Sequence, residues 1–87
     1  MSFSHVKYEV VEHDPDNGYT EHVCYCYLSI LPSKMDLIDA ICKVDQFASL
    51  FDVDRFKLIV PEGYLPSTVK LAWKDDGRVA YTAKPIK

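Results

Sequence analysis

The chain is poor in the residues that build catalytic loops. It has only three glycines, which lie far apart at positions 18, 63 and 77. Glycines so scattered cannot form a phosphate-cradling loop, and none of them is followed by the Lys-Ser/Thr pair of a P-loop. No serine lies in the Gly-x-Ser-x-Gly turn of a hydrolase. The sequence therefore predicts a protein that is not an enzyme.

Long apolar runs are missing as well. The longest fall far short of the roughly 18 residues that suggest a membrane span. The first residues, Met-Ser-Phe-Ser-His-Val-Lys, contain no apolar core of a secretory signal. We therefore expect neither a membrane protein nor a secreted one.

Cysteine is scarce and odd in number. Cys24, Cys26 and Cys42 are three thiols in a chain without an evident secretion signal, whereas a disulfide scaffold carries an even and denser set. This pattern predicts reduced thiols and a cytoplasmic location.

The composition that remains is that of an ordinary globular protein. The chain has 87 residues, of which 48% are hydrophobic and 26% are charged, which predicts one domain spanning residues 1–87. A chain of this size buries roughly 60–65% of the surface that its unfolded form exposes, enough for one modest core. The formal net charge is −3, with acids concentrated in the first third and bases in the last.

Two segments near the N-terminus, residues 6–13 and 19–31, are rich in β-branched and aromatic residues and predict strands. The Asp-Pro-Asp-Asn-Gly stretch between them has the residues that favour a tight turn. Together they predict a β-hairpin. Its register stays open, because pairing Val10 with His22 or with Val23 decides which face of the second strand is buried.

The residues from Pro32 onward predict a helix. Ser33 can cap its free amides, and Asp36 three residues later resembles a capping box. One helical face is apolar, with Leu37, Ile41, Val44 and Ala48, and the opposite face is polar, with Asp36, Asp39, Lys43 and Gln46. Phe47 and Leu50 break this pattern, so either the helix ends or kinks near Asp45 or these two side chains face something other than the core.

A third strand is predicted at residues 56–60, and a second hairpin at residues 68–73 and 78–84. A three-residue loop with Gly77 in the left-handed conformation places every large apolar residue of this hairpin on one face. That register pairs Trp73 with Val79, Leu71 with Tyr81 and Val69 with Ala83. The opposite face then carries Lys70, Ala72, Lys74, Arg78, Ala80, Thr82 and Lys84.

The predicted order of strand, strand, helix and three further strands indicates an α+β fold. We expect a single domain with a mostly antiparallel five-stranded sheet, covered on one face by the helix. The order is compatible with the β-grasp arrangement of ubiquitin. This likeness concerns topology alone and carries no function.

The cysteines and histidines raise the question of a metal site. Cys24, Cys26 and Cys42 with His5, His13 or His22 are zinc-ligand types, but paired ligands of structural zinc usually lie two to four residues apart on a turn. Buried cysteines on the core face of a strand explain the spacing better. The His-Asp-x-Asp-Asn stretch from His13 offers cation ligands, yet a hairpin turn needs the same residues. We expect no metal and no cofactor.

Aromatic and acidic residues point to a protein partner. If the even positions from His22 to Ile30 face the core, the intervening Tyr25 and Tyr27 face outward, and exposed aromatic residues are the usual anchors of protein contacts. The candidate binding residues are Tyr25, Tyr27, Phe47 and Leu50, with the acids Glu9, Glu12, Asp14, Asp16 and Glu21 of the first hairpin. We expect an inhibitor or adaptor, of the kind that phages and mobile elements encode, that docks on a larger protein or nucleoprotein complex or associates with itself.

Two alternatives remain at this point. Lys70, Lys74, Arg78 and Lys84 could neutralise phosphates in a nucleic-acid-binding module, although this face of the hairpin lacks interleaved aromatic residues and the chain is acidic. The other alternative is a small metal protein or enzyme that uses the cysteines and histidines. A membrane or a small-molecule substrate is not expected.

Overall fold

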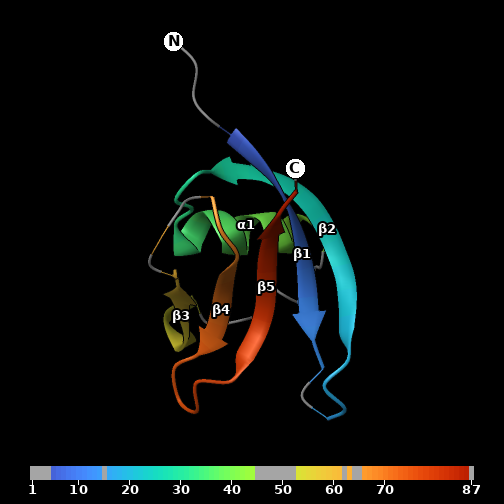
Figure 1. Ribbon diagram of the computed structural model, residues 1–87. Helices are drawn as coiled ribbons and strands as arrows, with labels where there is room; N and C mark the ends of the chain where they lie inside the picture. Colours follow the sequence, from blue (N-terminus) through green and yellow to red (C-terminus); the bar gives the residue numbers. More distant parts are fainter. Residues whose placement is uncertain (1–4, 15, 45–52, 62, 64–65, 87) are drawn as a thin grey trace.

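The elements of the fold follow one another in the order predicted from the sequence. The computed structural model describes residues 5–14, 16–44, 53–61, 63 and 66–86. The elements are β1 (His5–His13), β2 (Thr20–Ser29), α1 (Lys34–Val44), a short 3-10 turn (Val53–Arg55), β3 (Phe56–Ile59), β4 (Val69–Trp73) and β5 (Val79–Pro85). The five strands form one sheet in the order β2-β1-β5-β4-β3, which confirms the α+β class (Figure 1).

All four strand pairings are antiparallel. The first and last strands, β1 and β5, are neighbours in the middle of the sheet, and they too run antiparallel. In a β-grasp sheet the first and last strands run parallel. The arrangement is therefore not that of ubiquitin, although the helix covers one face of the sheet as expected.

The first hairpin has a register that neither of the two expected pairings describes. Val10 pairs with Cys24 and Val11 with His22, because a bulge leaves Val23 without an opposite residue on β1. A bulge adds one residue to one strand and so reverses the faces beyond it. As a result Cys24 faces the core as expected, whereas His22 lies on the opposite face.

The second hairpin matches the expected register over most of its length. Val69 pairs with Ala83 and Leu71 with Tyr81, as predicted. Nearer the turn, however, Val79 pairs with Ala72 and not with Trp73, because a second bulge shifts the register. Gly77 has the predicted positive φ, at 73°.

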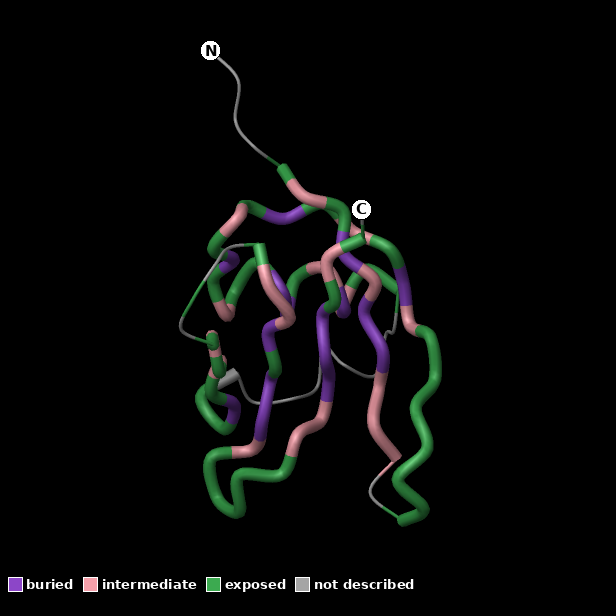
Figure 2. The backbone as a smooth tube through the Cα atoms, in the orientation of Figure 1, coloured by how far each residue is buried: buried purple, intermediate pink, exposed green. Residues whose placement is uncertain are grey.

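The core lies between α1 and one face of the sheet. Ser33 caps the helix, since its Oγ accepts a hydrogen bond from the Asp36 amide at 3.1 Å. The largest fully buried side chains are Tyr8, Val10, Leu37, Ile41, Phe56, Val69 and Leu71. Buried stretches occur both in the strands and in the helix (Figure 2). Val44, expected on the buried face, is 57% exposed because the described helix ends at this residue. Ala48, Gln46, Phe47 and Leu50 lie outside the described residues.

The side of the sheet turned away from α1 is called the open face below, because no described helix covers it. In Figure 1 this side lies toward the viewer and the strands pass in front of α1. By the strand pairings its members include Lys7, Glu9, Val11, His13, His22, Tyr25, Tyr27, Lys57, Ile59, Lys70, Ala72, Thr82 and Lys84. No helix among the described residues is long and apolar enough to cross a membrane.

Candidate functional site

Strand β2 is one of the two outer strands of the sheet and the longer of them. It has ten residues, whereas β3 at the opposite edge has four. Among the described strands, only β1 pairs with β2, so the outer side of β2 is available for pairing. An edge strand of this length presents a row of backbone donors and acceptors to which another extended chain can bind.

The backbone pairing shows which residues of β2 point outward. The Lys7 carbonyl accepts a hydrogen bond at 2.8 Å from the amide that directly follows β5, so Lys7 directs its backbone groups toward β5. Because the pairing side alternates along a strand, Tyr8 directs its groups toward β2, where it faces Cys26. The same alternation on β2 turns the amides and carbonyls of Tyr25 and Tyr27 toward the free edge.

The side chains of these two tyrosines are exposed, as the sequence predicted. Tyr25 is 56% exposed and Tyr27 is 66% exposed. The Lys7 ammonium lies 4.9 Å from the centroid of the Tyr25 ring, within cation–π distance, and the His22 ring centroid lies 4.6 Å from the same ring. Tyr25 is therefore held by neighbours, while Tyr27 projects further into solvent.

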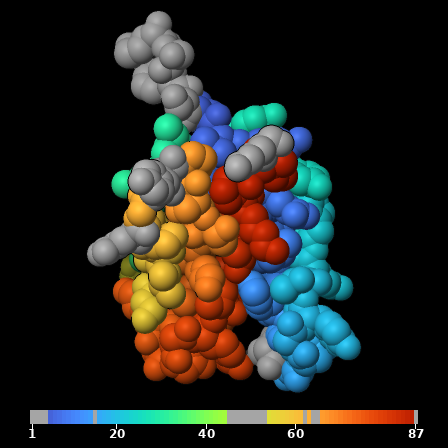
Figure 3. All heavy atoms as spheres, viewed as in Figure 1, coloured from blue at the N-terminus to red at the C-terminus, as the bar shows by residue number. Residues whose placement is uncertain are grey.

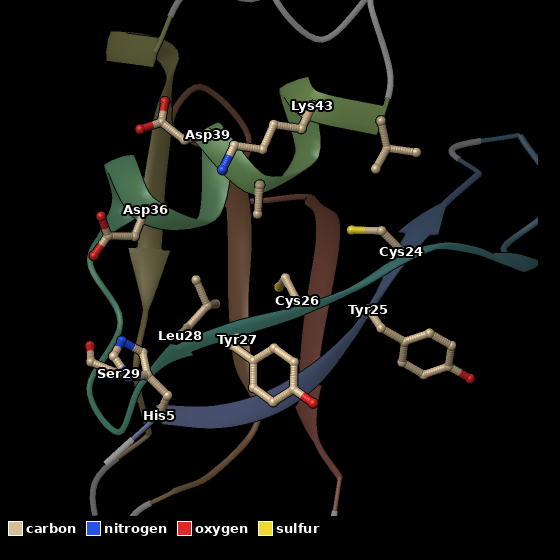
Figure 4. A pocket seen from close by; sticks show the side chains of 12 residues that line it. His5, Cys24, Tyr25, Cys26, Tyr27, Leu28, Ser29, Asp36, Asp39 and Lys43 are labelled. Carbon is tan, nitrogen blue, oxygen red and sulfur yellow. The ribbon is translucent and has the colours of Figure 1, made fainter. Parts of the chain in front are cut away.

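A groove of about 550 Å³ separates β2 from α1 on the other side of this strand. Asp36, Asp39 and Lys43 of α1 line one wall (Figure 4). On the other wall Cys24 and Cys26 point toward the helix, while the rings of Tyr25 and Tyr27 point away from it. The exposed charges of the helical wall are thus two carboxylates and one ammonium group, which makes that wall acidic.

The two cysteines in the groove are poor nucleophiles at neutral pH. Burial, with the neighbouring Cys24 thiol, raises the pKa of Cys26 to about 11. Burial also raises the pKa of Cys24, against a lowering effect of its hydrogen bond with Cys26. The reactive form of cysteine is the thiolate, so both side chains stay in the unreactive thiol form. The three described cysteines, including Cys42, are free.

No described cluster of three or more His, Cys, Asp or Glu side chains is placed to hold a metal ion. Two of the histidines instead contact neighbours on the open face. His13 Nε2 lies 2.6 Å from Thr82 Oγ1, and His22 Nδ1 lies 2.8 Å from a Glu9 carboxylate oxygen. These contacts fix positions within the sheet.

The acids predicted to form one binding site are distributed over three places. Glu9 lies on the open face beside His22. Asp14 belongs to the turn, where its carboxylate accepts a hydrogen bond at 2.8 Å from the amide of the exposed Asp16. Glu12 and Glu21 lie directly opposite each other across β1 and β2. Like charges at such a cross-strand position are unfavourable.

Only two of the four bases predicted for the second hairpin belong to strands. Lys70 and Lys84 lie in strands and point to the open face. Lys74 and Arg78 lie in the connection between β4 and β5, outside both strands, and Arg78 is paired with Asp76 at 3.5 Å. The Lys74 amide donates a hydrogen bond to the Arg55 carbonyl at 2.8 Å, so Lys74 continues the alternation of Lys70 and Ala72 beyond the end of β4. A basic hairpin face that also includes Arg78 stays a prediction.

Sequence reasoning missed several charged residues of the open face and of the groove. Lys7 and Lys57 reach the open face from β1 and β3, and Asp36 and Asp39 line the groove. Strand alternation would have assigned Lys7 and Lys57 a face only once the strand order was known. No family model matches this chain, and neither a curated protein nor a solved structure does.

Proposed function

We propose that this protein is a non-catalytic protein-binding module, of the inhibitor or adaptor type, that takes an extended segment of its partner along the free edge of β2. The observation that carries this proposal is the ten-residue edge strand with outward backbone groups at Tyr25 and Tyr27. Strand addition of this kind gains affinity from main-chain hydrogen bonds and specificity from side-chain contacts on either side of the new strand.

Both sides of the edge offer such contacts. On one side the exposed rings of Tyr25 and Tyr27 supply the aromatic anchors common at protein interfaces. On the other side the groove against α1 can accept alternate side chains of the added segment. The half-buried Cys26 lies in the floor of this groove and contributes an apolar surface.

The charges beside the edge favour a basic segment. Glu21 lies on β2 itself and Asp36 and Asp39 lie across the groove, against a single base, Lys43. Charge complementarity of this kind speeds association and selects the partner. The three free thiols support a reducing compartment, and we infer that the protein acts in the cytoplasm.

The test compares two substitutions of one residue, Tyr27→Pro and Tyr27→Ser. Both remove the ring, but only proline removes the outward amide and places its own ring where an added strand would pair. The tagged protein and both variants are used to capture partners from nuclease-treated lysate, and circular dichroism verifies that each variant is folded. A partner retained at reduced yield by Tyr27→Ser and lost with Tyr27→Pro supports strand addition.

Equal capture by the two variants would refute pairing at this edge. The double variant Asp36→Lys with Asp39→Lys tests the charge argument, because it should weaken capture of the same partner without changing the fold.

Light scattering of the purified protein addresses self-association. A mass that doubles from 10.0 kDa with concentration, and that Tyr27→Pro returns to the monomer value, would replace the separate partner by a second copy of this chain.

A further inference from the structure

The open face of the sheet gathers basic residues from four strands. Lys7, Lys57, Lys70 and Lys84 come from β1, β3, β4 and β5, and all four side chains are exposed. Glu9 is the acid on this face among the described strand residues, and it is hydrogen-bonded to His22. The face is therefore positive, although the formal net charge of the chain is −3.

The same face carries aromatic residues. Tyr25 pairs with Glu9 and Tyr27 with Lys7 across β1 and β2, and Glu9 in turn pairs with Lys84 on β5. Tyr27 thus lies beside Lys7, and Glu9 lies between Tyr25 and Lys84 on the same face. The second hairpin alone lacks such aromatic residues, and only the sheet order β2-β1-β5-β4-β3 brings them to the lysines.

We propose that the open face binds a single-stranded nucleic acid. Lysines across a sheet can follow the phosphates of one strand, and exposed aromatic rings can stack on its unpaired bases. A duplex offers no unpaired base to the tyrosines, so it would use the lysines alone. The side of the molecule on which this surface lies, opposite α1, is shown in Figure 3.

The two tyrosines have different roles in this proposal. Lys7 lies 4.9 Å from the centroid of the Tyr25 ring, so this ring already has a cation on one face. Tyr27 is 66% exposed and is the freer stacking platform. Residues two apart on a strand are separated by roughly 7 Å, which leaves room for each ring to contact a different base.

The lysines set the expected salt dependence. Four phosphate contacts with a single strand give a slope of log K against log salt of about −3. Lys84 lies on β5, two strands from β2, and Lys70 lies on β4, three strands away, so their substitution leaves the β2 edge intact. The open face and the β2 edge share the side chains of His22, Tyr25 and Tyr27, and this inference does not depend on the proposed protein partner.

The experiment measures fluorescence anisotropy of labelled oligo(dT) and oligo(U) of about 12 nucleotides, within the site sizes of known single-strand binders. The wild type should bind at low salt, more tightly than it binds a duplex of equal length. The double variant Lys70→Gln with Lys84→Gln should have roughly half the wild-type salt slope. Tyr27→Ser should weaken binding about tenfold, and Tyr25→Ser by less.

The matched control is Lys43→Gln with Arg78→Gln, which removes the same charge from α1 and from the turn between β4 and β5. It should bind like the wild type. Absence of binding to both oligonucleotides, tighter binding to the duplex, or equal losses in the two double variants would overturn the proposal. A preference between the DNA and RNA probes identifies which nucleic acid the face takes. Tyr27→Pro and Tyr27→Ser should bind oligonucleotide alike, whereas they differ in partner capture, so the two proposals fail separately.

Discussion

The Cys26 side chain on β2 contacts both the core and the groove. Its side chain packs against the core cluster yet lines the groove, and burial is the main reason that its pKa rises to about 11 from the ordinary 9.0. The folded state therefore favours the neutral thiol. Stability contributed by the neutral thiol is complete below pH 9.0 and is lost as the pH rises through about 11.

We predict that Cys26→Ala reduces the alkaline loss of stability. The free energy of unfolding, measured in urea at a series of pH values, should fall between pH 9.0 and about 11 in the wild type and fall less in the variant. Some loss remains, since burial also raises the pKa of Cys24 and of Tyr8. A difference between the two proteins that stays constant through this window would contradict the assigned environment of the thiol.

At the scale of the element, β2 alternates between two kinds of backbone position. Cys26 lies opposite Tyr8 and directs its amide into the sheet, whereas Tyr27 directs its amide toward the free edge. Proline lacks that amide, and within sheets it is confined mainly to edges where the missing donor faces solvent. The two positions should therefore respond differently to the same substitution.

We predict that Cys26→Pro destabilises the protein more than Tyr27→Pro does. The first removes a hydrogen bond inside the sheet and leaves a buried β1 carbonyl without its donor, at a cost of about 1–3 kcal/mol. The second removes a donor that faces outward. Thermal unfolding followed by circular dichroism, with Cys26→Ala and Tyr27→Ser as side-chain controls, measures both costs. Equal penalties would mean that β2 is not a free edge.

The periodicity of the sequence placed Cys24 and Leu28 on one face of β2 but left open whether that face is buried, which the structure shows it to be. It could not predict the bulge at Val23, since one extra residue leaves the local pattern on either side unchanged. The order of the strands in the sheet could not be predicted from the sequence either. The contact between His13 and Thr82 joins residues 69 positions apart, and no local pattern encodes such a pairing.

As with the fold, the features of the candidate sites that lie within one strand were predictable, and those that depend on strand order were not. The exposure of Tyr25 and Tyr27 follows from the alternation within one strand, which the sequence contains. The lysines of the open face come from strands whose neighbours are fixed only by the fold, so Lys7 and Lys57 were missed. A surface assembled from several strands depends on their order, which here is set by the central pairing of β1 with β5.

For the whole molecule, the charges divide between surfaces. Lysines collect on the open face, while Glu12 and Glu21 near the first turn and Asp36 and Asp39 on α1 make other surfaces acidic. The opposing charges nearly cancel, and the sequence pI is about 5.5. Near that pH the repulsion between molecules is weakest, and the β2 edge is then the surface on which copies most easily pair.

We predict that the protein associates through β2 as the pH approaches 5.5, and that a charge on this edge prevents it. Natural proteins protect edge strands with lysine, so Tyr27→Lys should lower the light scattering of concentrated samples at that pH. The control Met35→Lys makes the same change of charge at an exposed helical position and shifts the pI equally. If both variants suppressed scattering to the same degree, net charge alone would control association. A selective effect of Tyr27→Lys instead identifies the β2 edge as the surface of association. Tyr27 lies on β2, where a second chain would pair, whereas Met35 lies on α1.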